Sequence, residues 1–300
     1  MINLSRLRNL RENVIQHAGW EMFLMRLLLL WPFWLVVTRA VVQVQPKPNG
    51  LAHFVDLTWL ASPGIGNVLL GLFAVCGALY ATGFFVVPAL GIITAILVAK
   101  GTLINSQGAI NHALQLITLV ALAQWIVYCL RRPLGWTKRE SHLQAVHWAK
   151  VTIAASYVSA ALAKLFASSE FWIARVPYMA LQVIKSNLQS YYNDLVVTTS
   201  PIAEKFPHWV VENPNLTRVI FTGGLLLELF AFLALVNRWW ALFIGVSMLL
   251  LHWSIQILMN LEFKHHVYVL LIFYVNLPWL LYAAVQWLRR TFDKKPLAQP

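Results

Sequence analysis

Long apolar runs separated by short polar links make up almost the whole chain. A helix that crosses a bilayer needs about 20 apolar residues in succession. The stretch at residues 64–99 is too long for one such helix, and Thr82, Gly83 and Pro88 mark the expected reversal inside it. The pattern therefore predicts an all-α fold, a polytopic transmembrane helix bundle of about eight spans. The spans are expected at about residues 21–42, 65–83, 86–104, 109–129, 146–168, 217–237, 239–260 and 266–288.

The polar links carry most of their basic residues on one side of the predicted membrane. Lys and Arg concentrate in the cytoplasmic loops of membrane proteins. If the N-terminal arginines at residues 6–11 are cytoplasmic, eight spans also place the basic positions at 131–139, 238 and 289–295 in the cytoplasm. We therefore expect an integral membrane protein with both termini in the cytoplasm and residues 289–300 as a cytoplasmic tail. A bacterial inner membrane is the expected location.

The composition agrees with this class, because 59% of the residues are hydrophobic and only 11% are charged. A net charge of +12 would also suit a nucleic-acid-binding protein, but here the positive residues lie between apolar runs. Membrane lipid, and no nucleic acid, is the expected partner. Residues 1–300 are predicted to form a single membrane domain. The one long polar link, 169–216, is predicted to cap the external face as an interfacial or re-entrant helical segment.

Lys164 is the most informative polar residue, because it interrupts the otherwise uncharged run at residues 151–167. An ionisable side chain inside a membrane span is costly and by default marks a functional site. The alternative is snorkelling, in which a lysine near a helix end lifts its amine to the lipid headgroups. The helical rise puts Lys164 about 6 Å below the external end of its span.

Two histidines from other spans are expected in the same leaflet. By the same rise, His112 lies about 5 Å and His252 about 12 Å below the external surface. His112 can also be an interfacial residue, and His252 can be a histidine packed between helices. The coincidence of both histidines with Lys164 in one layer favours a shared site. The candidate catalytic residues are therefore Lys164, His112 and His252.

Two further charges fall deep within predicted spans, Glu228 near the middle of the sixth and Arg26 in the first. We expect a buried structural ion pair between Arg26 and Glu228, because either charge alone would be stranded in hydrocarbon. No metal site is expected. The sequence lacks an HExxH motif, and the neighbours His265 and His266 do not have the spacing of a metal site.

The run YVSAALAKLFASSEFW, from Tyr157 to Trp172, resembles the segment Y-x-x-A-G-x-x-K-L-…-W of vitamin K-dependent gamma-glutamyl carboxylases and their bacterial relatives, the HTTM membrane-domain family. Lys164 falls on the lysine thought in that family to deprotonate the reduced quinone. Asn111 and His112 resemble the N-H pair that opens another span of the carboxylases, where the histidine is implicated in catalysis.

Two other stretches extend the resemblance over most of the chain. MRLLLLWPFW places Arg26 on the first-helix arginine of the family. The family also has an acidic-residue helix followed by a histidine-bearing helix, and a similar stretch here is LLLELFAFLALVNRWWALFIGVSMLLLHWSIQILM. The resemblance puts Glu228 and His252 on the acidic and histidine positions of the family. Two departures occur beside the lysine: Ala161 stands where a glycine is usual, and Ala163 stands where the vertebrate enzymes carry a second lysine.

The resemblance implies a membrane enzyme that uses a reduced quinone, such as a vitamin K-type hydroquinone, menaquinol or ubiquinol. Lys164 would deprotonate the quinol, while His112 and His252 would position it or carry protons. In the family, oxygenation of the anion yields a strong base that removes a proton from a carbon acid, and carbon dioxide then adds. The candidate quinol-binding residues are Asn111, Tyr157, Trp172 and Trp253.

The partner and two other functions stay open at this stage. The chain ends at Pro300 without the large extracytoplasmic domain through which carboxylases hold their peptides, so we expect a peptide or protein substrate to be presented by an extracytoplasmic partner subunit. One alternative is an electron-transfer subunit in which His112 and His252 ligate a haem b. The other is a non-catalytic maturation or scaffold subunit that keeps the fold without the chemistry.

Overall fold

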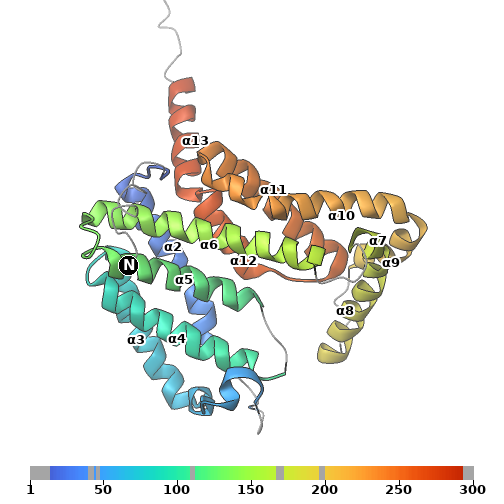
Figure 1. The fold of residues 1–300 in the computed structure, drawn as a ribbon, viewed down its shortest axis with the longest axis horizontal. Helices are drawn as coiled ribbons and strands as arrows, with labels where there is room; N and C mark the ends of the chain where they lie inside the picture. The colour runs from blue at the N-terminus through green and yellow to red at the C-terminus, as the bar shows by residue number, and fades with distance from the viewer. Residues whose placement is uncertain are drawn as a thin grey trace, which may run out of the picture. The chain divides into compact units, whose positions relative to one another are not determined.

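The computed structural model describes residues 14–39, 44, 48–108, 112–166, 172–195 and 200–292. In this described part the chain is all-α, without a strand, which confirms the predicted fold class (Figure 1). Several of its helices are long and apolar enough to cross a membrane. These helices are α2 (Gly19–Thr38), α3 (Pro63–Thr82), α4 (Val86–Asn105), α6 (Lys138–Phe166), α11 (Arg238–Met259), and α10 (Pro214–Leu229) together with the short helix η5 (Ala231–Leu235).

The other two predicted spans are a shorter helix and a broken one. The predicted fourth span is α5 (His112–Leu130), whose apolar part, Leu114–Leu130, is shorter than the other candidates. The predicted eighth span consists of residues Lys264–Tyr274, which include α12 (Lys264–Val269), followed after a 52° bend by α13 (Leu277–Phe292).

The helix α6 begins upstream of residue 146, where the apolar pattern put the start of the span. Thr137 and Glu140 form a reciprocal capping box at its first turn. The Thr137 backbone N–H donates to the Glu140 carboxylate at 2.7 Å, and the Glu140 backbone N–H donates to the Thr137 hydroxyl at 3.2 Å. Such a box satisfies N–H groups that have no partner within the helix. The polar cap therefore extends the helix beyond the apolar run.

The chain divides into two compact units, each containing part of the predicted bundle. Unit 1 consists of Met1–Ala149 and Leu271–Pro300, and unit 2 consists of Lys150–Leu270. In unit 1, α3 packs against α2 and α4, and α4 packs against α5 (Figure 1).

The close approach of α4 to α5 depends on Gly91. The Trp125 indole N–H on α5 donates to the Val87 carbonyl on α4 at 3.1 Å. A Cβ atom added to Gly91 would lie 2.7 Å from Trp125 Nε1. Only a glycine at this position leaves room for the indole to reach the α4 backbone.

Gly91→Ala is expected to destabilise unit 1 by about 1–3 kcal/mol, because the added methyl group displaces a packed indole. Thermal unfolding of the purified protein in detergent measures the change. Gly71→Ala is the matched control, since nothing lies within 4 Å of a Cβ placed there. A Gly91→Ala protein that melts with the wild type would contradict the packing described here.

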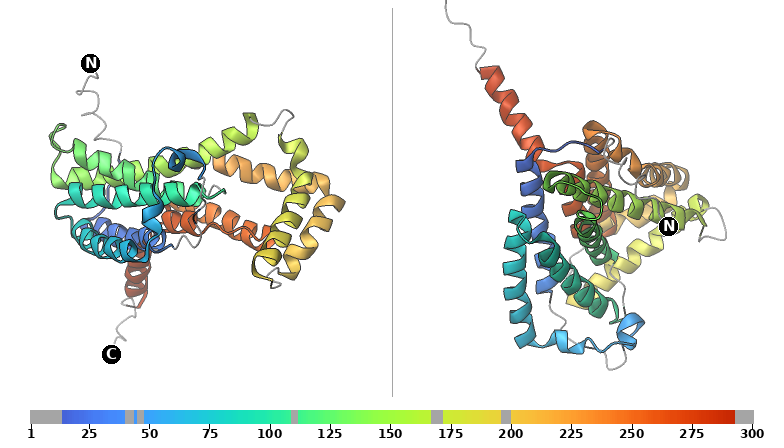
Figure 2. Two further views of the ribbon diagram at one scale, coloured as in Figure 1. Left: turned by 90° about the horizontal axis from the view of Figure 1, so that it is seen from below. Right: turned by 60° about the vertical axis from the view of Figure 1, so that its left-hand side comes forward.

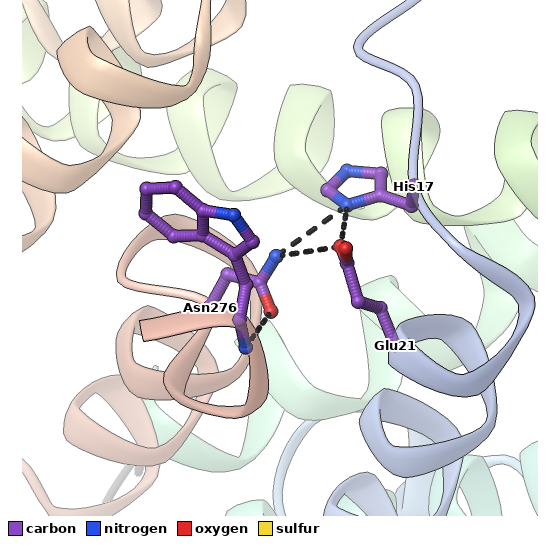
Figure 3. Close-up of polar contacts among 4 residues, drawn as sticks. His17, Glu21 and Asn276 are labelled. Carbon is purple, nitrogen blue, oxygen red and sulfur yellow. Dashed lines mark hydrogen bonds and ion pairs between the residues drawn. The ribbon is translucent and has the colours of Figure 1, made fainter. Parts of the chain in front are cut away.

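A buried cluster in unit 1 explains the break before α13 (Figure 3). The side-chain amide of Asn276 donates to Glu21 Oε2 at 3.2 Å, and His17 Nδ1 lies 2.9 Å from the same carboxylate oxygen. The amide oxygen of Asn276 accepts the Trp279 backbone N–H at 3.3 Å. Asn276 has a left-handed backbone, with φ 52°, which ends the preceding helical segment. This one residue therefore starts α13 and ties it to the first turn of α2.

The described part of the predicted external link, residues 169–216, includes the helices α7 (Trp172–Arg175), α8 (Met179–Asp194) and α9 (Pro201–Glu212), all in unit 2. The side chain of Ser200 caps α9 by accepting the Ala203 backbone N–H at 3.1 Å. The helices α8 and α9 lie side by side (Figure 2). They share a small core with α11, made of Ala180, Val183, Phe206, Val210 and Met259.

Candidate functional site

Lys164 forms an ion pair with Glu228, in which Lys164 Nζ donates to Glu228 Oε2. The pair joins α6 to α10. The Lys164 side chain is 35% exposed and the Glu228 side chain 13% exposed, so the carboxylate is the more buried member. A carboxylate beside the ammonium offsets much of the cost of placing a cation in an apolar segment.

The ion pair lies in the wall of a cavity of about 650 Å³ in unit 2. Most of the cavity wall is apolar and comes from α8, α9, α10 and α11. A volume of this size is typical of sites for small organic ligands. The charged or hydroxyl-bearing side chains of its lining are Lys164, Lys205, Glu228 and Ser254.

The spacing of residues on α10 and α11 builds the apolar wall. Phe221, Gly224 and Glu228 follow at intervals of three or four residues, which places them on one face of α10. Leu251 and Ile255 line the cavity from α11 in the same way. A Cβ atom on Gly224 would lie 3.4 Å from the Leu251 side chain, so α10 and α11 approach each other closely beside the cavity.

Trp172 borders the cavity beside the ion pair. The Lys164 amine lies 5.8 Å from the centroid of the Trp172 ring, within the range of a cation–π contact. Trp172 was expected to be a quinol-binding residue, and its place in the cavity wall is compatible with that role.

His252 and Tyr157 form a second polar group in unit 2. The Tyr157 hydroxyl and His252 Nε2 are 2.7 Å apart, and both side chains are buried. The other ring nitrogen of His252 has no hydrogen-bond partner in the described part of the chain. The His252 ring packs against that of Phe263 with 5.0 Å between centroids, and Phe263 lines the cavity. The Tyr157–His252 pair therefore lies behind the cavity wall and does not form part of it.

The other predicted site residues are Trp253, His112 and Asn111. Trp253 is 53% exposed and does not line the cavity. His112 is the first residue of α5, but its side chain lies outside the described residues, as does the whole of Asn111. Their assignment to the site stays a prediction.

The expected ion pair between Arg26 and Glu228 needs correction, because each residue has another partner within its own unit. Glu228 pairs with Lys164, as described above. The Arg26 guanidinium donates from Nε to the Ala81 carbonyl and from Nη1 to His142 Nδ1, both at 3.1 Å. An arginine can only donate, so Nδ1 of His142 accepts and its Nε2 carries the proton. In unit 1 the Arg26 guanidinium therefore donates hydrogen bonds to neutral acceptors.

Lys205 is the functional candidate that the sequence did not reveal. It lies in the polar link that precedes α10, where one more lysine is not conspicuous. Its place in the cavity wall follows from the folding of α9 onto α11. Among the described residues, no group of three or more His, Cys, Asp or Glu side chains could hold a metal ion.

Comparisons of the chain with protein-family models, with curated proteins and with solved structures found no match. The resemblance to the carboxylase family therefore stays a prediction that rests on the quoted residues.

Proposed function

We propose that the protein is an integral membrane enzyme that binds a lipid-soluble quinol in the cavity of unit 2 and removes a proton from it with Lys164. The observation that carries this proposal is the Lys164–Glu228 pair in the wall of a mostly apolar cavity. Apolar walls suit a prenylated ring, and the charged pair offers proton chemistry at one place on that wall.

The proton transfer uses both members of the pair. A neutral amine is a base matched to a phenolic hydroxyl, because the ordinary pKa values of a phenol and an alkylammonium are both about 10. For Lys164 to act as a base its ammonium must first give up a proton, and the Glu228 carboxylate is in contact with it as an acceptor. The quinol O–H bond then breaks, its proton moves to Nζ, and the electron pair stays on the quinol oxygen. Lys164 thereby becomes an ammonium that stabilises the quinol anion.

The roles of the other residues follow from their positions. Trp172 would cover one face of the ring beside Lys164, where aromatic surfaces pack well. Tyr157 precedes Lys164 by seven residues, so the two residues lie two turns apart on the same side of α6. Tyr157 and His252 would hold the cavity wall through Phe263 and accept protons passed from the site. Oxygenation of the anion, carboxylation, the inner membrane and a peptide-presenting partner are proposed from the family resemblance.

Lys164→Met is expected to lower menaquinol-dependent oxygen uptake by the purified protein at least about 100-fold, the usual scale for loss of an acid–base group. The control is Lys185→Met, because Lys185 is an exposed lysine on α8 that does not line the cavity. Uptake by Lys185→Met should match the wild type. Full uptake by Lys164→Met would exclude Lys164 as the base and favour a scaffold function for the ion pair.

A further inference from the structure

We propose that Lys205 is a specificity-determining residue of this cavity, which donates a hydrogen bond to the quinol oxygen remote from Lys164. This inference rests on the proposed quinol function and names the second polar contact of the same site.

The first observation is the position of Lys205. It lines the cavity from α9, whereas Lys164 lines it from α6. A ligand in the cavity therefore meets a lysine from each of two helices. A monophenol would have an oxygen for only one of them.

The second observation concerns the partners of the two lysines. Lys164 is paired with Glu228, the one carboxylate among the described residues that line the cavity. Within the described ranges Lys205 makes no hydrogen bond or ion pair, although an ammonium has three N–H donors. A ligand oxygen that accepts from Lys205 would add a charge-assisted hydrogen bond without breaking one in the protein.

The third observation is the surface beside Lys205. Phe206 and Trp209, also on α9, line the cavity with stacked rings whose centroids are 5.8 Å apart and whose planes differ by 14°. Both rings are held in place, since Phe206 belongs to the core shared with α8 and α11 and Trp209 packs against that core. A flat ligand would find an apolar aromatic surface and a donor next to each other on one helix.

Equilibrium binding measures the contribution of the second oxygen. The ligands are a 1,4-naphthoquinol with a short prenyl tail and the matched 1-naphthol, which lacks the second hydroxyl, both added under anaerobic conditions to the full chain in detergent. Quenching of tryptophan fluorescence reports binding, because Trp172 and Trp209 line the cavity. The wild type is expected to bind the quinol about tenfold more tightly than the naphthol, the ratio expected for one hydrogen bond from a charged donor.

The variants assign that preference to Lys205. Lys205→Met is expected to bind the two ligands within about twofold of each other, since the donor is lost. Lys205→Arg, which keeps a charged donor, and the control Lys185→Met should keep the preference. Lys205 is exposed, so its replacement does not disturb the core.

Two results would overturn the inference and leave the quinol function intact: equal binding of the two ligands by the wild type, or an undiminished preference in Lys205→Met. If the wild type binds neither ligand, the proposed function fails and this inference fails with it.

Discussion

Gly224→Phe is expected to abolish quinol binding, with a loss of affinity of at least about 100-fold. Gly224 lines the cavity, and a Cβ atom there already reaches 3.4 Å from the Leu251 side chain. A phenyl ring in that direction would occupy the space that the ligand needs. A 100-fold loss of affinity corresponds to about 3 kcal/mol of binding free energy. Titration of the naphthoquinol by tryptophan fluorescence measures it.

Gly223→Phe is the matched control for this substitution. Gly223 is the neighbouring residue on α10, but it is exposed, does not line the cavity, and has nothing within 4 Å of an added Cβ. The same side chain at position 223 should leave affinity within about twofold of the wild type, because it points away from the ligand. Equal affinities for the two variants would mean that the ligand binds elsewhere.

Glu228→Gln is expected to impair both stability and turnover. The substitution removes the charged partner of the Lys164 ammonium in a mostly apolar wall. Breaking a fully buried pair costs about 3–5 kcal/mol and an exposed pair less than about 1, so this half-buried pair should cost about 1–3 kcal/mol. Menaquinol-dependent oxygen uptake should fall at least about 100-fold, because the carboxylate that takes the proton from Lys164 is lost. Thermal unfolding and oxygen uptake are measured on the same preparation.

The double variant Lys164→Met, Glu228→Met separates the structural role of the pair from its chemical role. Two apolar side chains of similar volume should restore stability to within about 1 kcal/mol of the wild type, since neither leaves an unpaired charge. Oxygen uptake should stay lost. Recovery of uptake together with stability would show that the pair is only a structural link between α6 and α10.

The apolar pattern predicted the fold class because the length of a membrane helix is fixed by the bilayer and can be read along the chain. Its errors occur where polar contacts decide a helix end. The reciprocal cap of Thr137 and Glu140 extends α6, and the left-handed Asn276 divides the last predicted span. Neither the cap nor the left-handed residue changes the apolar pattern, so the spacing of hydrophobic residues cannot predict where these helices begin or end.

Lys164 could be selected from the sequence because an isolated cation in an apolar run is costly. Its partner, Glu228, could not be identified from the sequence. Depth along a helix gives no information about which face a side chain occupies, so Glu228 was assigned to Arg26 on cost alone. The structure shows that Arg26 is satisfied by the neutral acceptors Ala81 and His142, which carry no signal in a search for opposite charges. The contribution of Lys205 likewise depends on how α9 folds and not on sequence spacing.

The state of a bound naphthol tests most directly whether Lys164 acts as a base. Free naphthol is mostly neutral near pH 7, because a phenol has an ordinary pKa of about 10. The absorption spectrum of naphthol saturating the wild-type protein at neutral pH should be that of the naphtholate anion, and that of naphthol bound to Lys164→Met should be the neutral spectrum. A neutral spectrum in the wild type, or the anion in both proteins, would contradict deprotonation by Lys164.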